Sequence, residues 1–403
     1  MANASEPRFL VRGAPDYRRA TLALFLAGFS SFAVLYCVQP LLPVFVQEFG
    51  VSSAQSALPL SLATALLAAA ILVAAAVSEG FGRRGLMFVS MALASILTVA
   101  AALAPSWTML LALRAVAGFV LGGVPAVAMT YLAEETEPKG LGFAMGLYVG
   151  GTAFGGMVGR VGTGVLTELF GWRVALFCVG AICLVAAAGF LWLLPASRNF
   201  TPRRSFDPRH HLRRWAGLFR PGPLPLLFFI SFVAMGAFIT VYNYAGFRLM
   251  APPYNLGHAE LGLLFLVYVF GIASSATAGF FIDRFGRRIV LPAGLLVTGL
   301  GVALTLLPGL AAIAAGIVVL TIGFFFSHSV ASSWVGRAAG QARGHASALY
   351  LLAYYLGASI AGWVGGWFWD WAGWPGVAGF TLALLCLGVA AALGLARVAR
   401  PPA

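Results

Sequence analysis

The chain has 403 residues, of which 61% are hydrophobic and only 9% are charged. Because soluble globular chains carry about 25% charged residues, this composition argues against a water-soluble enzyme, a disordered scaffold and a nucleic-acid-binding domain. Lys and Arg number 25 against 12 Asp and Glu, which gives a formal net charge of +13. In a membrane protein such an excess marks cytoplasmic loops and faces anionic lipid headgroups, so it indicates topology and not a nucleic-acid partner.

Apolar runs of about 20 residues, the length that crosses a membrane as a helix, recur along the whole chain. They start near residues 20, 56, 85, 107, 141, 173, 224, 259, 288, 309, 345 and 374. Twelve spans place both termini on one side of the membrane. If that side is the cytoplasm, the basic residues left outside cytoplasmic segments are Arg114, Arg160, Arg173 and Arg248. We therefore predict an all-α integral membrane protein with twelve transmembrane helices and cytoplasmic termini.

The two halves of the chain resemble each other in sequence. Segment 78–84 (SEGFGRR) recurs as 282–288 (IDRFGRR), and 148–150 (YVG) recurs as 355–357 (YLG). Such duplication predicts two pseudo-symmetric six-helix bundles, an architecture typical of transporters. The predicted organisation is a cytoplasmic tail (1–19), a bundle (20–194), a basic cytoplasmic linker (195–223), a second bundle (224–397) and a short cytoplasmic tail (398–403).

The sequence gives no indication of metal binding or nucleotide binding. The cysteines lie inside apolar runs, at spacings that suit neither a zinc site nor a disulfide; they are Cys37, Cys178, Cys183 and Cys386. No glycine-rich phosphate loop followed by Lys and Ser or Thr occurs. We expect no catalytic residue, no cofactor and no bound metal, and the protein is not expected to be an enzyme.

Segment 279–288 (GFFIDRFGRR) resembles the loop signature G-x-L-a-D-r-x-G-r-r of the major facilitator superfamily, and segment 75–84 is a degraded copy. The resemblance implies a gating latch, in which each acid lies beside the positive N-terminus of a helix in the other half and holds the cytoplasmic side shut. Glu79 would lie near His345, and Asp283 near Gly140. A hydrophilic turn with stop-transfer charges is the alternative. The expected latch residues are Glu79, Arg83, Arg84, Asp283, Arg284, Arg287 and Arg288.

Two arginines lie within predicted spans. Arg114 lies about 10 Å deep, at 1.5 Å per residue, in a segment that resembles the superfamily element R-x-x-q-G. It either snorkels to the headgroups or serves a cavity in proton or substrate handling. Arg160 ends a run of glycines at intervals of four, which resembles the glycine-rich helix of antiporters but is also explained by close helix packing. Together the two cations could form a site that attracts anions.

Polar and aromatic residues at span positions complete the candidate site. His328 is a titratable residue well inside a span, suited either to a proton relay or to a hydrogen bond with a neighbouring helix. Aromatic and amide side chains occupy matching ends of the first and seventh spans, as Tyr36 with Gln39 and Tyr242 with Asn243. Together with Tyr355 they either line a cavity or form the aromatic belt at the interface. No carboxylate occupies the centre of a span.

The whole chain from about residue 20 to 397 is similar to twelve-span transporters of the major facilitator superfamily. Segments 36–43, 123–129 and 328–334 resemble more narrowly its YnfM-type branch, near the drug:H+ antiporters. The resemblance implies a monomer in a bacterial inner membrane, whose bundles rock about a cavity lined by spans one, four, seven and ten. Spans two, five, eight and eleven would lie at the interface between the bundles.

This resemblance leads to one functional expectation with two alternatives. The protein is expected to be a secondary active transporter that exports a small organic molecule or drug by proton antiport. Its partners would then be the small-molecule substrate, protons and membrane lipid. An exporter or facilitator of organic anions that is not coupled to protons is the first alternative. A non-transporting membrane sensor built on a transporter fold is the second.

Overall fold

The computed structural model describes residues 9–200, 208–220 and 222–398, with the side chains of 75–81, 126, 208–212 and 396–398 outside the description. The helices of the first half are α1 (Pro15–Tyr36), η1 (Gln39–Leu41), α2 (Leu42–Phe49), α3 (Ser53–Ser56), α4 (Leu58–Phe81), α5 (Arg83–Ala102), α6 (Trp107–Leu121), α7 (Pro125–Glu135), α8 (Pro138–Phe170) and α9 (Trp172–Leu193). Helix α10 (Pro208–Leu218) follows. The second half contains α11 (Pro223–Met250), α12 (His258–Leu263), η2 (Leu264–Val267), α13 (Tyr268–Phe285), α14 (Arg287–Leu304), α15 (Leu310–Ala338), η3 (Gly340–Ala342) and α16 (Arg343–Val398).

The described helices account for the twelve predicted spans. Nine segments are long and apolar enough to cross a membrane. The last of them, Gly340–Leu395, holds non-helical backbone at Ala372 and Gly373, which divides it into two spans. The shorter apolar helices Leu58–Ala74 and Trp107–Leu121 supply the remaining two. The prediction of an all-α membrane protein is confirmed.

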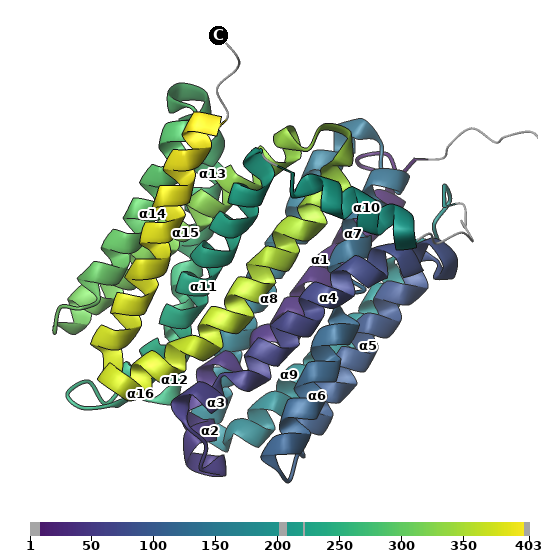
Figure 1. Cartoon of the computed structure of the whole chain (residues 1–403). Coiled ribbons are helices and arrows are strands. Elements are labelled where there is room, and N and C mark those ends of the chain that lie inside the picture. Colours follow the sequence, from purple (N-terminus) through teal and green to yellow (C-terminus); the bar gives the residue numbers. More distant parts are fainter. Residues whose placement is uncertain (1–8, 201–207, 221, 399–403) are drawn as a thin grey trace, which may run out of the picture.

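The two halves of the chain form two side-by-side bundles. Helices α4, α5, α6 and α9 lie at the right of Figure 1, and α13, α14, α15 and the end of α16 lie at the left. Helix α10 lies at the top, where α1 begins and α16 ends, and we call this the linker end. Helices α2, α3 and α12 lie at the bottom, which we call the opposite end.

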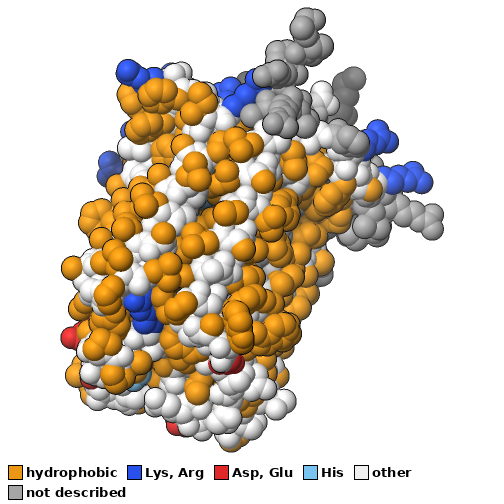
Figure 2. All heavy atoms as spheres, turned by 60° about the vertical axis from the view of Figure 1, so that its left-hand side comes forward, with side chains coloured by type: hydrophobic (Ala, Val, Ile, Leu, Met, Phe, Trp, Pro, Cys, Tyr) orange, Lys and Arg blue, Asp and Glu red, His pale blue; other side chains and the backbone are white. Residues whose placement is uncertain are grey.

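The surface of the molecule suits a lipid environment. Large hydrophobic side chains point outward along the helices, with Trp371 79% and Val185 73% exposed. Figure 2 shows hydrophobic side chains over the length of one face, while most of the visible Lys and Arg gather at the linker end. Monomeric soluble proteins do not expose apolar surface on this scale. The molecule is therefore a multi-pass membrane protein.

Two spans are interrupted where the sequence removes helical hydrogen bonds. The first span ends as an α-helix at Tyr36, and Pro40, which lacks a backbone N–H, follows inside η1. The fourth span breaks between α6 and α7, where Pro125, which also lacks a backbone N–H, begins α7. These breaks leave backbone carbonyls in the membrane interior that other groups must satisfy.

Glycines on α8 allow this helix to approach both halves closely. A Cβ at Gly155 would lie 2.1 Å from the carbonyl oxygen of Phe29 on α1, so the two backbones touch. Farther along α8, a Cβ at Gly164 would lie 2.6 Å from the carbonyl oxygen of His258 on α12 of the other half. Close packing therefore explains only part of the glycine spacing, because a Cβ at Gly142, Gly146 or Gly150 would meet open space. The contacts of Gly155 and Gly164 place the intervening Arg160 where the two halves meet.

The central linker contains a helix that the sequence analysis did not predict. Within the expected linker 195–223, helix α10 presents Trp215 and Leu218 at helical spacing, and both pack partly buried against the core. The ring of Trp215 meets that of His345 on α16, with centroids 6.3 Å apart. Arginines before and after these two residues, at 213, 214 and 220, hide this short apolar stripe from a scan for hydrophobic runs.

Candidate functional site

A central cavity of about 580 Å³ lies between the two halves. Helices α1, α7 and α8 line it from the first half, and α11, α13, α15 and α16 from the second. Spans one, four, seven and ten contribute as the superfamily resemblance implied, and spans five, eight and eleven contribute as well. Aromatic rings from both halves make up much of the wall, among them Tyr36, Phe238, Tyr268, Phe324, Tyr354 and Tyr355. This size and this lining are typical of sites for small organic molecules.

Arg160 is the permanently charged side chain among the lining residues that the structure describes. Only 2% of its surface is exposed. Its Nε donates a hydrogen bond of 2.6 Å to Gln39 Oε1, and its Nη1 donates one of 2.8 Å to the carbonyl oxygen of Gly156. No carboxylate lies within salt-bridge distance in the described chain. Neutral oxygens therefore hold this cation.

Aromatic rings from both halves surround the guanidinium group of Arg160. Its central carbon lies 3.9 Å from the ring centroid of Tyr36 in the first half. In the second half it lies 5.1 Å from the ring of Phe265 and 5.0 Å from that of Tyr268. Such cation–π contacts are strongest where water is excluded. They offset part of the cost of burying a cation that has no counter-ion.

Gln39 and Asn243 connect Arg160 to the second half. Gln39 accepts from Arg160 through Oε1 and donates through Nε2 to Asn243 Oδ1 over 2.8 Å. Because Arg160 can only donate, it fixes which end of the Gln39 amide faces it. Both amides are buried with 2% exposure and do not belong to the cavity lining described for this chain. Together the three residues form a continuous polar link across the interface.

Tyr242 and Tyr355 hold different positions around the cavity. Tyr242 is buried behind the wall, where its hydroxyl lies 2.7 Å from Thr321 Oγ1 and its ring stacks on Phe265. Tyr355 lies in the wall itself and packs edge-on against Tyr354. Neither tyrosine is a lipid-facing residue of the interfacial belt, since both are only 3% exposed.

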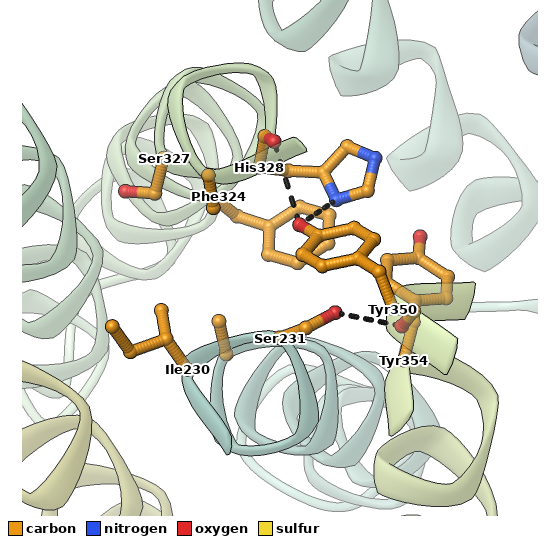
Figure 3. Close-up of a pocket in the computed structure, with 9 residues that line it drawn as sticks. Ile230, Ser231, Phe324, Ser327, His328, Tyr350 and Tyr354 are labelled. Carbon is orange, nitrogen blue, oxygen red and sulfur yellow. Dashed lines mark hydrogen bonds between the residues drawn. The ribbon is translucent and has the colours of Figure 1, made fainter. Parts of the chain in front are cut away.

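His328 lies in the cavity wall opposite the first half, and also borders a pocket of about 10 Å³, enough for roughly one water. Its Nδ1 lies 3.0 Å from the hydroxyl of Tyr350, whose own backbone carbonyl accepts a hydrogen bond from Ser231 (Figure 3). The other ring nitrogen points away from Tyr350. His328 is thus bonded to a neighbouring helix through one nitrogen and keeps the second available to the cavity.

Arg114 has a different environment from Arg160, although both are buried. Its Nη1 and Nη2 donate to the carbonyl oxygens of Val34 and Leu35, over 2.9 and 2.7 Å. These carbonyls belong to the last turn of α1, which ends at Tyr36 and so leaves them without helical partners. Arg114 is not among the described cavity-lining residues. It caps the broken end of α1, where a cation also complements the helix dipole.

Comparison with known proteins identifies the family. A family model described as Major Facilitator Superfamily matches residues 24–255 and 234–403. The chain belongs to the major facilitator superfamily. This membrane transporter is 45% identical over 386 residues, 96% of its chain and 92% of the relative, to the inner membrane transport protein YnfM of Escherichia coli (strain K12). It is 41% identical over 394 residues, 98% and 97% of the two chains, to the uncharacterized MFS-type transporter YybF of Bacillus subtilis (strain 168).

The architecture also matches a solved structure. The transporter is similar to a bacterial homolog of the human lysosomal transporter Spinster, solved in an inward-facing and unoccupied conformation. The TM-score is 0.76 at 18% identity, over 97% of this chain and 100% of the other. At this identity the similarity extends to the fold alone. The predicted superfamily, branch and two-bundle architecture are therefore confirmed.

The first-half arginines of the expected latch bind within their own half of the transporter. Arg83 at the start of α5 makes a two-pronged ion pair with Glu134 on α7, with Nη2 to Oε1 at 2.7 Å and Nε to Oε2 at 3.1 Å. Arg84 donates to the carbonyl oxygen of Leu191 at the end of α9. The side chain of Glu79 lies outside the described residues. These contacts tie the loop to helices of the first bundle.

The second-half copy of the motif is more open. Asp283 and Arg284 are exposed, whereas Arg287 and Arg288 are half-buried. Gly140, the expected neighbour of Asp283, instead lies against Tyr17, whose hydroxyl donates a hydrogen bond of 2.8 Å to its carbonyl oxygen. A latch role for the second-half residues remains a prediction for another conformation of the transporter.

Two features of the site were missed by the sequence analysis. Glu168 at the end of α8 accepts a hydrogen bond of 2.7 Å from the backbone N–H of His258 on α12, which joins the halves at the opposite end. Phe265 and Tyr268 complete the ring cluster around Arg160. The chain has 32 Phe and 11 Tyr. An aromatic residue in a span therefore carries too weak a signal to be singled out.

Proposed function

We propose that the protein is a secondary active transporter that exports a small organic molecule from the bacterial cytoplasm by alternating access. The observation that carries this proposal is the aromatic cavity of about 580 Å³ between two halves that are closed on each other beyond it. Each chain holds a complete cavity, which supports a monomer as the working unit. The alternation requires the closed end to open and the linker end to close.

Several contacts support closure at the opposite end. Gln39 bonds to Asn243, and Glu168 bonds to the N-terminus of α12. A Cβ at Gly366 of α16 would lie 2.2 Å from the Cα of Ala54 on α3, so these backbones of different halves touch. Residues of the cavity wall extend from Arg160 toward the linker end. We infer that the substrate enters at the linker end in this conformation.

The charge distribution supports a cytoplasmic linker end. Lys and Arg gather there on the face shown in Figure 2, and cytoplasmic loops of membrane proteins are enriched in these residues. Under this orientation the termini and α10 lie in the cytoplasm and the cavity takes its substrate from there. Export then follows when the halves part at the opposite end. The loop motifs around Arg83 and Asp283 would hold the cytoplasmic side shut in that second conformation.

Proton antiport is the proposed energy source, and His328 is the residue proposed to carry the proton. Among the described lining residues it is the side chain whose ordinary titration range lies near neutral pH, because no carboxylate lines the cavity. A hydrogen bond to Tyr350 orients the ring and leaves the second nitrogen for a proton. Substrate binding and proton binding would then exclude each other within one conformational cycle.

The test is transport by purified protein in proteoliposomes of defined orientation, with a labelled panel of neutral, cationic and anionic aromatic molecules. Export by antiport predicts accumulation only while a proton gradient is present, and its loss when nigericin collapses the gradient. Flux that ignores the gradient would contradict antiport but keep the transporter. If no member of the panel moves, the non-transporting sensor is favoured. Empty liposomes measure leakage.

A further inference from the structure

Arg160 keeps hydrogen-bond donors that nothing in the described chain accepts. Its Nε bonds to Gln39 and its Nη1 to Gly156, but no described residue accepts from Nη2. A guanidinium group that is 98% buried normally has every nitrogen bonded and an anion beside it. Arg160 has neither, although it lines a cavity large enough for a ligand. An acceptor of opposite charge is therefore missing from this site.

The comparison with Arg114 shows that access to the cavity is what distinguishes Arg160 from this other buried arginine. Arg114 is equally buried, but both of its terminal nitrogens bond to the broken end of α1. Its Nε is buried without a hydrogen-bond partner, but Arg114 lies away from the described cavity lining, so no ligand in the cavity can supply one. Arg160 also has two bonded nitrogens, but its third nitrogen, Nη2, belongs to a side chain that lines the cavity. The acceptor for Nη2 must therefore come from outside the described chain.

We propose that Arg160 binds the carboxylate or sulfonate group of the substrate, and that the transported molecule is an aromatic organic anion. This inference rests on the proposed transport function and names its substrate class. Nη2, together with the second hydrogen of Nη1, presents the planar pair of donors that matches two oxygens of such a group. The anion supplies the counter-charge that the buried guanidinium lacks.

The other residues of the cavity wall determine what kind of group can be attached to the anionic end of the substrate. Tyr36 and Tyr268 flank Arg160, so a ring attached to the anionic group packs against aromatic faces and edges. Farther along the wall, Phe324, Tyr354 and His328 continue this surface. A single cation without any lining carboxylate fits one negative charge and disfavours a cationic substrate. The site therefore selects a monoanion with an apolar aromatic body.

Three probes of the same ring system separate charge from shape. They are naphthalene-2-carboxylate, naphthalene-2-carboxamide and naphthalene-2-methylammonium, titrated calorimetrically into the purified transporter in nanodiscs at neutral pH. We expect the carboxylate to bind about tenfold or more tightly than the carboxamide, because a charge-assisted contact in a buried site is lost in the amide. The ammonium should bind most weakly. Equal affinities for carboxylate and carboxamide, or no saturable carboxylate binding, would overturn the proposal.

Variants then assign the preference to one residue. Arg160→Met keeps much of the volume and should lower carboxylate affinity about tenfold or more, while carboxamide affinity stays within about twofold. Arg248→Met, which removes an arginine outside the described lining, should change neither affinity. Arg160→Lys keeps the charge without the planar donor pair, so it should retain a reduced preference for the carboxylate even if Arg160→Met does not fold. An unchanged preference in Arg160→Met, or a complete loss of preference in Arg160→Lys, refutes the assignment.

Transport measurements with the three probes test the anion preference and the proposed transport function separately. Export of the carboxamide or the ammonium at the same rate as the carboxylate would leave the transporter standing and remove the anion preference. Saturable binding of the carboxylate through Arg160 without flux of any probe would keep the site and remove the transport function. The two proposals therefore fail through different measurements.

Discussion

Gln39 of η1 donates a hydrogen bond of 2.8 Å to Asn243 of α11, and this bond joins the two halves of the transporter inside a fully buried interface. The same amide accepts from Arg160 at the cavity wall. A ligand bound to Arg160 would thus be two hydrogen bonds away from this contact between the halves. In the proposed transport cycle the contact breaks before the opposite end opens, so the link would connect substrate binding to that change.

Removing the acceptor of this bond should favour the state that is open at the opposite end. In Asn243→Leu the Nε2 of Gln39 is left buried without a partner, which costs the closed state about 1–3 kcal/mol, or a roughly 5- to 150-fold shift in population. The measurement uses Ala54→Cys, at the contact of α3 with Gly366, in a background without the native cysteines. Labelling by a membrane-impermeant maleimide from outside should accelerate accordingly.

Tyr242→Phe is the matched control for Asn243→Leu. It removes a buried hydrogen bond, 2.7 Å long, from the neighbouring position of α11, but its partner Thr321 belongs to the same half. Loss of this bond should lower stability without changing the labelling of Ala54→Cys. Equal acceleration in both variants would mean that the labelling reports general loosening, and the gating role of Asn243 would be lost.

Glu168 should act as a second contact of the same kind. Its carboxylate accepts from the backbone N–H of His258 over 2.7 Å, and Glu168→Ala leaves the start of α12 without this partner. We expect faster external labelling of Ala54→Cys in this variant. Glu48→Ala removes a carboxylate that pairs with Arg173 inside the first half and should leave labelling unchanged. Faster labelling in Glu48→Ala than in Glu168→Ala would contradict a gating role for Glu168.

Arg114 is expected to act on the stability of the first bundle and not on the choice of substrate. Arg114→Met removes both donors from the last turn of α1, at about 1.5–3 kcal/mol for each hydrogen bond made by a charged group. The melting temperature and the transport rate should both fall. The ratio of carboxylate to carboxamide affinity should stay within about twofold of its original value. A lost ratio in a folded Arg114→Met protein would place this arginine in the binding site.

The fold of the transporter was largely predictable because apolar length and repetition are local properties of the chain. Each predicted start lies near a helix beginning, for example 345 beside Arg343 and 224 beside Pro223. The unpredicted helix α10 carries its apolar residues between arginines, so a scan for continuous hydrophobic runs passes over it. The prolines at the two interruptions, Pro40 and Pro125, are visible in the sequence, but the groups that bond to the freed backbone carbonyls are not.

Of the eight residues expected to line the cavity, four are absent from the described lining, namely Gln39, Arg114, Tyr242 and Asn243. Tyr36, Arg160, His328 and Tyr355 do line the cavity. Arg114 was predicted at a depth similar to that of Arg160, and its different role follows from which side of its helix it occupies. The bond between Gln39 and Asn243 depends on how one half is placed against the other. A sequence shows the position of a residue along a helix far better than its partner across an interface.

The glycines of α8 allow a last prediction that tests close packing directly. Gly155→Ala would place its Cβ 2.1 Å from the carbonyl oxygen of Phe29, so α1 and α8 must separate, which moves Arg160 of α8 relative to Tyr36 of α1. We expect a loss of about 1–3 kcal/mol in stability and weaker carboxylate binding. Gly162→Ala, on the same helix with no atom within 4 Å of the added Cβ, should instead gain up to about 1 kcal/mol from helix propensity. Thermal unfolding and probe titration of both variants provide the measurement, and equal behaviour of the two would show that α8 does not depend on contact with α1.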